Sequence, residues 1–151
     1  MKGITFPKLD GSSLKIGIAV ARWNEHITKK LLEGCKEVLL ECNVLPENII
    51  ELETPGSYEL PYAAQQLIKK RGVNAVVCLG TLIKGETMHF EYISQAVTQG
   101  IMDINLEHDA PVIFGILTCL TEEQAMARAT GDNNHGFGWG KSAVEMALIG
   151  K

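Results

Sequence analysis

The stretch AVVCLGTLIKGETMH at residues 75–89 decides the fold, because it contains an apolar run, a short polar loop and the start of a helix in that order. The run Ala75–Leu82 has the length and the uncharged composition of a buried parallel strand. We expect a helix from about Thr87 to Leu106 to follow it. A strand that leads directly into a helix is the repeating unit of a parallel α/β sheet.

Two such units precede this stretch. The run Lys15–Ala21 is short and nearly continuously apolar, as expected of a strand covered on both faces. From Glu25 to Cys42, apolar residues recur at the spacing of an amphipathic helix. Asn48–Glu53 predicts a second strand. Pro55-Gly56 then opens a helix to about Lys70, where a basic turn followed by glycine indicates the helix end.

A further unit follows the central stretch. Pro111–Leu117 predicts a fourth strand, and the capping-box pattern at Thr121–Gln124 opens another helix. Gly131–Gly140 contains several glycines and asparagines and is expected to be a loop. A last helix is expected from about Lys141 to Leu148.

This alternation predicts a doubly wound α/β domain, in which a four-stranded parallel sheet carries helices on both faces. The sequence contains no internal repeat, low-complexity tract or interdomain linker, so we expect residues 1–151 to form a single domain. Residues 1–13 are expected to form a separate N-terminal arm, which either pairs with a neighbour's sheet or hangs free.

Composition narrows the class of protein. Of 151 residues, 46% are apolar and 21% charged, and the net charge is −4. This balance is globular, and the acidic charge disfavours nucleic acids and membrane surfaces as partners. The longest apolar runs are strand-sized, and Pro7 and Asp10 lie where a secretory signal would need an apolar stretch. We therefore expect a cytoplasmic protein.

The four cysteines do not form a metal motif. Cys35, Cys42, Cys78 and Cys119 include no C-x-x-C pair and have no histidine at zinc-finger spacing. All four lie in segments predicted as helix or strand, where a free cysteine behaves as a small apolar residue. We expect buried, reduced thiols and no metal site.

The carboxyl ends of the predicted strands carry the candidate functional residues. Ligands of open parallel sheets bind outside these ends. Four segments rich in functional residue types follow the four predicted strands, at Ala21–Asn24, Pro55–Glu59, Gly80–His89 and Leu117-Thr118. Their convergence indicates a binding site more strongly than any single motif.

The third of these segments favours an anion site. Gly85, Glu86 and Thr87 precede a predicted helix, so their N–H groups would point from its positive end. His89 lies one turn inside that helix and could exchange protons with a bound ligand, because imidazole titrates near neutrality. The alternative is that Thr87 is only an N-cap and His89 only a surface residue.

Other segments carry candidates for binding a planar ring. Trp23 could stack on a flat heterocycle or pad the core. Gly56 and Ser57 could hydrogen-bond the polar edge of a ring or form a helix cap. Glu59 could accept hydrogen bonds from ligand hydroxyl groups or complement the helix dipole.

Two further candidates lie nearer the C-terminus. Arg128 could be exposed or could bind a phosphate in a bidentate manner. His135 could be a ligand-binding residue or an ordinary turn residue. Common nucleotide and hydrolase motifs are absent, since no G-x-G-x-x-G follows the first strand and the chain has neither a Walker loop nor a G-x-S-x-G elbow.

These segments closely resemble the lumazine synthase family (6,7-dimethyl-8-ribityllumazine synthase). In chain order, the matching segments are ARWNE at 21–25, PGSYELP at 55–61, LGTLIKGETMHFEYI at 79–93, PVIFGILT at 111–118, EEQAMARA at 122–129 and NHGFGWGKSAVEMA at 134–147. The resemblance covers nearly the whole chain, and its long central motif is highly specific.

The resemblance implies a flavodoxin-like transferase of riboflavin biosynthesis that uses no cofactor. Enzymes of this family condense 5-amino-6-ribitylaminopyrimidinedione with 3,4-dihydroxy-2-butanone 4-phosphate. It implies His89 as the proton-transfer residue. The implied phosphate-binding residues are Gly85, Glu86, Thr87 and Arg128. The implied pyrimidine- and ribityl-binding residues are Trp23, Asn24, Gly56, Ser57, Glu59, Thr81, Leu82, Ile83, Phe114 and His135.

The resemblance also implies a homopentamer with sites between adjacent subunits, to which Phe114 and His135 look like contributions from the neighbour. Trp23 and His135 resemble the fungal-type branch, which tends to stop at pentamers. The short segment between Arg128 and His135 instead resembles relatives that build icosahedral shells, so both assemblies stay open. Glu86 replaces a small residue common in the family, and beside a phosphate its carboxylate must point away.

Two other functions stay open beside catalysis. A flavin or pteridine carrier would use the same cleft without turnover, and a shell protein would keep the cleft only as a remnant. His89 and Arg128 favour catalysis, because a carrier does not need a proton shuttle within reach of an anion site.

Overall fold

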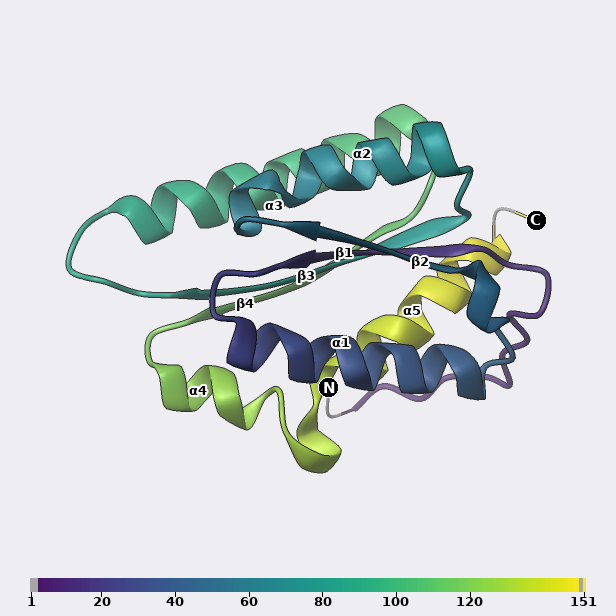
Figure 1. Cartoon of the computed structure of the whole chain (residues 1–151), viewed down its shortest axis with the longest axis horizontal. Coiled ribbons are helices and arrows are strands. Elements are labelled where there is room, and N and C mark those ends of the chain that lie inside the picture. The colour runs from purple at the N-terminus through teal and green to yellow at the C-terminus, as the bar shows by residue number, and fades with distance from the viewer. Residues whose placement is uncertain (1–2, 150) are drawn as a thin grey trace.

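A computed structural model describes residues 3–149 and 151 and contains one parallel sheet (Figure 1). The strands are β1 (Ile16–Ala21), β2 (Ile49–Thr54), β3 (Ala75–Ile83) and β4 (Val112–Cys119), in the order β2-β1-β3-β4. All three pairings are parallel. This is the order of the first four strands of a flavodoxin-like sheet. The predicted four-stranded, doubly wound α/β fold is confirmed.

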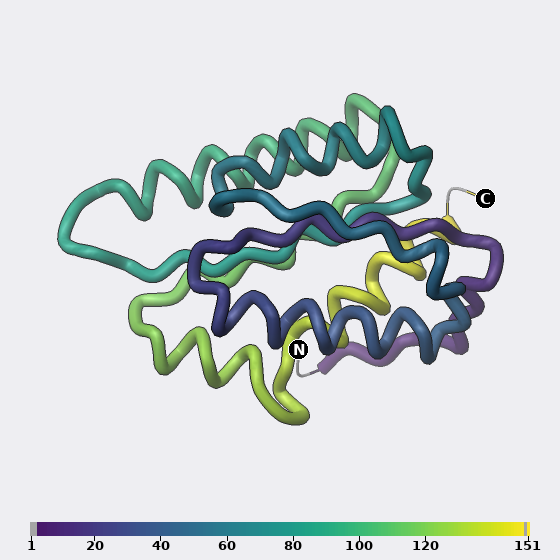
Figure 2. The backbone as a smooth tube through the Cα atoms, in the orientation of Figure 1, coloured from purple at the N-terminus to yellow at the C-terminus, as the bar shows by residue number. Residues whose placement is uncertain are grey.

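Helices cover both faces of the sheet (Figures 1 and 2). One face carries α2 (Leu60–Arg71) and α3 (His89–His108), and the other carries α1 (Glu25–Glu41), α4 (Glu122–Ala127) and α5 (His135–Ile149). Three short 3-10 turns, η1 (Pro46–Asn48), η2 (Ser57–Glu59) and η3 (Gly131–Asn133), lie in the connections.

Alternation along the central strands produces two different apolar cores. On β1, Ile16, Ile18 and Val20 face the core beneath α1 and α5, whereas Ala19 and Ala21 face the core beneath α2 and α3. Every residue of β1 is buried, as expected of a parallel strand covered on both faces. The large side chains therefore point towards α1 and α5, and small ones leave room for α2.

Two helix ends follow the local sequence signals. Gly72, after the basic last turn of α2, adopts a left-handed conformation with φ of 62°, which glycine adopts without strain. At the start of α4, Thr121 Oγ1 accepts a hydrogen bond from the N–H of Gln124 at 3.3 Å. The predicted end of α2 and the predicted cap of α4 are both confirmed.

The predicted start of α5 was wrong, and α3 begins two residues later than expected. The helix α5 begins at His135, whereas Lys141 was expected. Its glycines pack against α1: a Cβ atom on Gly136 would lie 2.3 Å from the carbonyl oxygen of Leu31. The glycine-rich segment therefore serves close helix packing and is largely not a loop. The helix α3 begins at His89 and not at Thr87.

The N-terminal segment lies against the side of the molecule that carries α1 (Figure 2). The N–H of Gly11 donates a 2.6 Å hydrogen bond to the carbonyl oxygen of Cys42, and Gly11 itself is buried. Leu9 packs against the α1–α5 core. Residues 3–8 are mostly exposed. The part of the predicted arm nearest the first strand is thus attached to this chain, and residues 1 and 2 lie outside the described residues.

The cysteines are buried as predicted. Burial raises the pKa of the Cys35 and Cys78 thiols to about 12, so both are protonated at neutral pH and poor nucleophiles. In the described ranges, His, Cys, Asp and Glu side chains do not gather in groups of three or more that could hold a metal ion. None of the described helices is both long and apolar enough to cross a membrane.

Candidate active site

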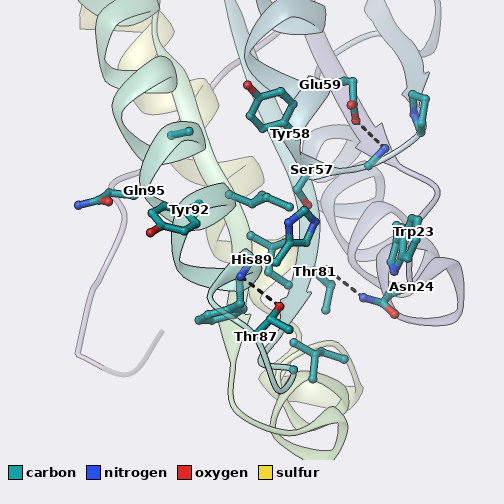
Figure 3. Close-up of a pocket in the computed structure, with 18 of the residues that line it drawn as sticks. Trp23, Asn24, Ser57, Tyr58, Glu59, Thr81, Thr87, His89, Tyr92 and Gln95 are labelled. Carbon is teal, nitrogen blue, oxygen red and sulfur yellow. Dashed lines mark hydrogen bonds between the residues drawn. The ribbon is translucent and has the colours of Figure 1, made fainter.

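A cavity of about 1160 Å³ opens at the carboxyl edge of the sheet, where the connections after β1, β2 and β3 converge (Figure 3). Three walls form it: the turn between β1 and α1, the turn η2 with its flanks, and the face of α3. The end of β3 forms the floor. The volume is sufficient for two small substrates at once. The predicted convergence of these segments is confirmed for three of the four, since no residue of Leu117-Thr118 lines the cavity.

The β1–α1 turn supplies an aromatic wall. Trp23 is 74% exposed and lines the cavity, so the alternative that it pads the core is wrong. The N–H of Trp23 donates to the carbonyl oxygen of Pro55 at 3.0 Å. Asn24 adopts a left-handed conformation with φ of 60°, and its side-chain amide donates to the carbonyl oxygen of Thr81 at 2.9 Å. These two bonds tie the turn to the adjoining segments, so the indole stands on a fixed backbone.

The turn after β2 presents a hydroxyl group and a carboxylate. Ser57 is buried and lines the cavity, and its hydroxyl lies against the backbone of β3. A Cβ atom on Gly80 would lie only 2.4 Å from Ser57 Oγ, so glycine is required there. Glu59 Oε2 accepts a hydrogen bond from the N–H of Gly56 at 2.9 Å. Glu59 is therefore a helix cap through one carboxylate oxygen and also lines the cavity.

The floor contains a polar atom without a protein partner. Thr81 is 1% exposed, and its Oγ1 has no hydrogen-bond partner among the described residues. A buried hydroxyl without a partner costs free energy, which a ligand in the cavity would recover. Leu82 and Ile83 continue the floor and are half-buried.

The connection between β3 and α3 is open and polar. Gly85, Glu86 and Thr87 are exposed, and a Cβ atom added to Gly85 would meet no atom within 4 Å. Gly85 and Thr87 line the cavity, whereas Glu86 does not. Glu86 thus lies off the cavity, as a bound phosphate would require. Unpaired N–H groups at the start of a helix attract anions.

His89 is the first residue of α3, and its ring projects into the cavity between Tyr92 and Trp23 (Figure 3). The N–H of His89 donates to Thr87 Oγ1 at 3.4 Å. This bond supports the interpretation of Thr87 as a capping residue. A capping role does not prevent Thr87 from also binding a ligand. His89 is exposed and lines the cavity beside the open connection.

Three predicted site residues lie elsewhere in the chain. Phe114 on β4 is half-buried against the α2–α3 core. Arg128 ends α4, and its Nη1 donates to the carbonyl oxygen of Gln124 at 2.8 Å. His135 contacts Trp139 edge-on, with ring centroids 5.6 Å apart. None of the three lines the cavity of its own chain.

Arg128 and His135 are themselves neighbours. The N–H of His135 donates to the carbonyl oxygen of Arg128 at 2.9 Å. Partial burial lowers the pKa of His135, and the positive charge of Arg128 adds to the effect. Both effects favour the neutral imidazole, which can accept a hydrogen bond. Together the two residues form a second polar group on the α1 side of the sheet.

Several lining residues were not predicted. Tyr58, Phe90, Tyr92, Gln95 and Gln99 extend the cavity along η2 and α3. A signal was present in the sequence, because His89, Tyr92, Ala96 and Gln99 recur at three- and four-residue spacing and so share one face of a helix. The sequence alone did not show which face of this helix would line the cavity.

Comparison with known proteins identifies the family to which this chain is similar. The family model described as 6,7-dimethyl-8-ribityllumazine synthase matches residues 13–151. The chain is 41% identical to a protein of that name from Pyricularia oryzae, over 97% of this chain and 93% of the relative. It is 45% identical to one from Schizosaccharomyces pombe, over 98% and 95%. A relative from Cytophaga hutchinsonii is 50% identical over 82% and 78%. The chain therefore belongs to the 6,7-dimethyl-8-ribityllumazine synthase family.

Proposed function

We propose that this chain is a transferase that condenses 5-amino-6-ribitylaminopyrimidinedione with 3,4-dihydroxy-2-butanone 4-phosphate to give 6,7-dimethyl-8-ribityllumazine. The observation that carries the proposal is the placement of His89, Trp23 and the open Gly85–Thr87 connection around one cavity. A flat platform, a proton carrier and an anion site are the three elements that this condensation requires.

The phosphorylated substrate is assigned to the start of α3. Gly85 leaves the backbone open to close approach, and Thr87 adds a hydroxyl group beside it. The partial positive charge at the N-terminus of a 20-residue helix supports an anion there. Glu86 contributes its backbone N–H while its side chain stays off the cavity.

The pyrimidine is assigned to the region between Trp23 and the floor. Its ring stacks on the exposed indole, and its polar edge meets Ser57 and the β3 end. Thr81 Oγ1, which is buried without a partner among the described residues, gains a hydrogen bond in this arrangement. Asn24 and Glu59 lie at the rim, where the ribityl hydroxyl groups would extend. Gly56, Leu82 and Ile83 complete the ring-edge contacts.

The chemistry proceeds by proton transfers. The amino group of the pyrimidine attacks the ketone, and loss of water gives an imine. Phosphate then leaves by elimination, and closure of the second ring releases a second water molecule. His89 is the group positioned to take and return protons, because it is the histidine that lines the cavity and imidazole is suited to acid–base catalysis. The substrates are already reactive, so positioning supplies most of the acceleration.

The complete site is assigned to the boundary between two subunits of a homopentamer, with pentamers either free or built into a shell. Arg128, Phe114 and His135 do not reach the cavity of their own chain, and an adjacent copy would supply them. Arg128 then offers the phosphate the cation that the cavity's own lining lacks. We further propose that residues 1–151 act as one domain in the cytoplasm.

A turnover assay tests the proposed function. The purified protein is mixed with both substrates without added metal, and the product is followed by absorbance and fluorescence. We expect the wild type to form product well above the uncatalysed rate. The control variant is His26→Ala, which removes a histidine outside the cavity and should form product as fast as the wild type. Product at the uncatalysed rate together with tight riboflavin binding would contradict the proposal and favour a carrier.

A further inference from the structure

We infer that the ion pair between Lys84 and Glu91 positions the catalytic histidine: it joins the end of the sheet to the first turn of α3 and so fixes the connection that carries His89. This inference rests on the proposed function of the cavity. Neither residue lines the cavity, so neither contacts a substrate, and both act through the segment between them.

The pair spans the open connection from one end to the other. Lys84 is the first residue after β3, and its N–H donates to the carbonyl oxygen of Cys119 on β4 at 2.9 Å. The backbone of Lys84 is therefore part of the sheet. Its ammonium group pairs with Glu91 Oε1, two residues into α3 beyond His89. The ion pair thus links the rigid sheet to the helix that begins with the catalytic imidazole.

Lys84 makes a second contact with the same helical turn. Its Nζ lies 5.9 Å from the centroid of the Phe90 ring, within the range of a cation–π interaction. Phe90 lines the cavity. The lysine is thereby held between Phe90 and Glu91, the two residues that directly follow His89.

The connection has little else to hold it. Gly85 has no neighbour within reach of an added Cβ atom, and Glu86, Thr87 and Met88 are exposed. The hydrogen bond from His89 to Thr87 is long, at 3.4 Å, and lies within the connection, so it does not tie that segment to the sheet. Precise placement of His89 therefore depends on the pair at the ends.

The pair also balances charge beside the anion site. Glu91 Oε2 is buried without a hydrogen-bond partner among the described residues, and Lys84 compensates the charge of this carboxylate, whose side chain as a whole is 34% exposed. Without Lys84, an uncompensated negative charge would lie near the site assigned to phosphate. It would oppose the binding of an anion.

The variants Lys84→Met and Glu91→Gln distinguish the effect of losing the ion pair from the effect of the negative charge that remains on Glu91. Both variants lose the pair, so kcat should fall about tenfold in each. Only Lys84→Met leaves the extra negative charge, so only that variant should also raise KM for the butanone phosphate. Because the contact is shared, the double variant should lose no more in kcat than either single variant. Lys84→Arg should keep kcat within about threefold.

The matched control is Lys36→Met, which breaks an ion pair of similar exposure between α1 and β2. Partly exposed pairs contribute little to stability, so we expect both lysine variants to melt within a few degrees of the wild type. We expect Lys36→Met to leave both kcat and KM unchanged. Values of kcat within twofold of wild type in both Lys84→Met and Glu91→Gln would overturn the inference.

Amide hydrogen exchange gives a readout that needs no turnover. In Lys84→Met, the amides of residues 92–95, which are the first hydrogen-bonded amides of α3, should exchange about tenfold faster than in Lys36→Met, with the rest of the chain unchanged. Equal exchange in the two variants would overturn the inference even if the wild type did not form lumazine. An inactive wild type would contradict the proposed function alone.

Discussion

Two glycine-rich regions of this chain use glycine in opposite ways. In α5, a Cβ atom on Gly136 would lie 2.3 Å from the carbonyl oxygen of Leu31, and one on Gly140 would lie 2.4 Å from Val38 Cγ1. At Gly85, an added Cβ atom would meet no atom within 4 Å. Glycine brings two helices together in the first region and leaves the backbone open to a ligand in the second. The packed region should therefore set stability, and the open region should set activity.

The two regions also differ in what glycine costs. Within a helix, glycine is less favourable than alanine by about 1 kcal/mol per residue. The helix α5 forms despite this cost because its packing against α1 and the sheet buries Ala143, Val144 and Trp139. In the open connection no helix is present to destabilise, so glycine there has a smaller cost and a different role.

The largest expected effect tests the open region. His89→Ala should lower kcat about a hundredfold, because a positioned general acid or base contributes at least that much. Some turnover should remain, since positioning of the substrates is intact. Steady-state rates at saturating concentrations of both substrates measure the effect, and the melting temperature should not change because His89 is exposed. Complete loss of turnover while both substrates still bind would contradict this prediction.

The next effect tests the packed region. Gly136→Ala places a methyl group against the backbone of α1, which cannot move aside by rotating a side chain, so the variant should lose about 2 kcal/mol of stability. Thermal unfolding should show a melting temperature lower by about 4–8 °C. The folded fraction should keep the wild-type kcat. A change of kcat without a change in melting temperature would break the comparison between the two regions.

A smaller effect is expected at Arg128, which precedes the packed region by a few residues and yet is assigned to the site. Arg128→Ala should raise KM for the butanone phosphate by about tenfold or more, since a charged hydrogen bond contributes roughly 1.5–3 kcal/mol. The matched control is Arg71→Ala, which removes an arginine at the C-terminal end of α2. An unchanged KM would remove Arg128 from the phosphate site.

Mixed assemblies sharpen the Arg128 prediction. If Arg128 acts in a neighbour's cavity, an assembly refolded from His89→Ala and Arg128→Ala chains contains some sites with both residues intact. At butanone phosphate concentrations below KM, such mixtures should be more active than the mean of the two single variants. No recovery would mean that the two residues act within one chain.

The smallest effect is expected at Gly85. Gly85→Ala should leave the melting temperature within one or two degrees of wild type, because the added methyl group meets no protein atom. KM for the butanone phosphate should rise about threefold, or roughly 0.7 kcal/mol, as the methyl group narrows the approach to the backbone. A marked loss of stability would show that this connection is packed after all.

The strands and the cavity edge could be predicted from the sequence because they depend on local signals. The uncharged run Ala75–Leu82 has one compatible environment, a strand buried on both faces. Once the strands were in place, the parallel arrangement brought their carboxyl ends together. The segments around Trp23, Ser57 and His89 therefore converge as predicted.

The remaining features depended on tertiary contacts. The start of α5 could not be predicted, because packing against α1 overrides the poor helix propensity of Gly136 and its neighbours. Tyr58 and Tyr92 became part of the cavity only through the placement of α3 beside η2. The exposure of Trp23 likewise depended on the path of the turn, since aromatic residues after a strand are also common in cores.

The opposite environments of the two tryptophans give this protein a built-in spectroscopic reference. Trp23 stands 74% exposed at the cavity, whereas Trp139 is 8% exposed and its ring lies against Gly115 of β4. Emission from the first should lie at longer wavelength and be quenched by iodide, while emission from the second should be shifted to the blue and shielded. A ligand that stacks on Trp23 would alter one component only, and loosening of the helical layer would alter the other. One emission spectrum can therefore separate occupancy of the cavity from integrity of the fold.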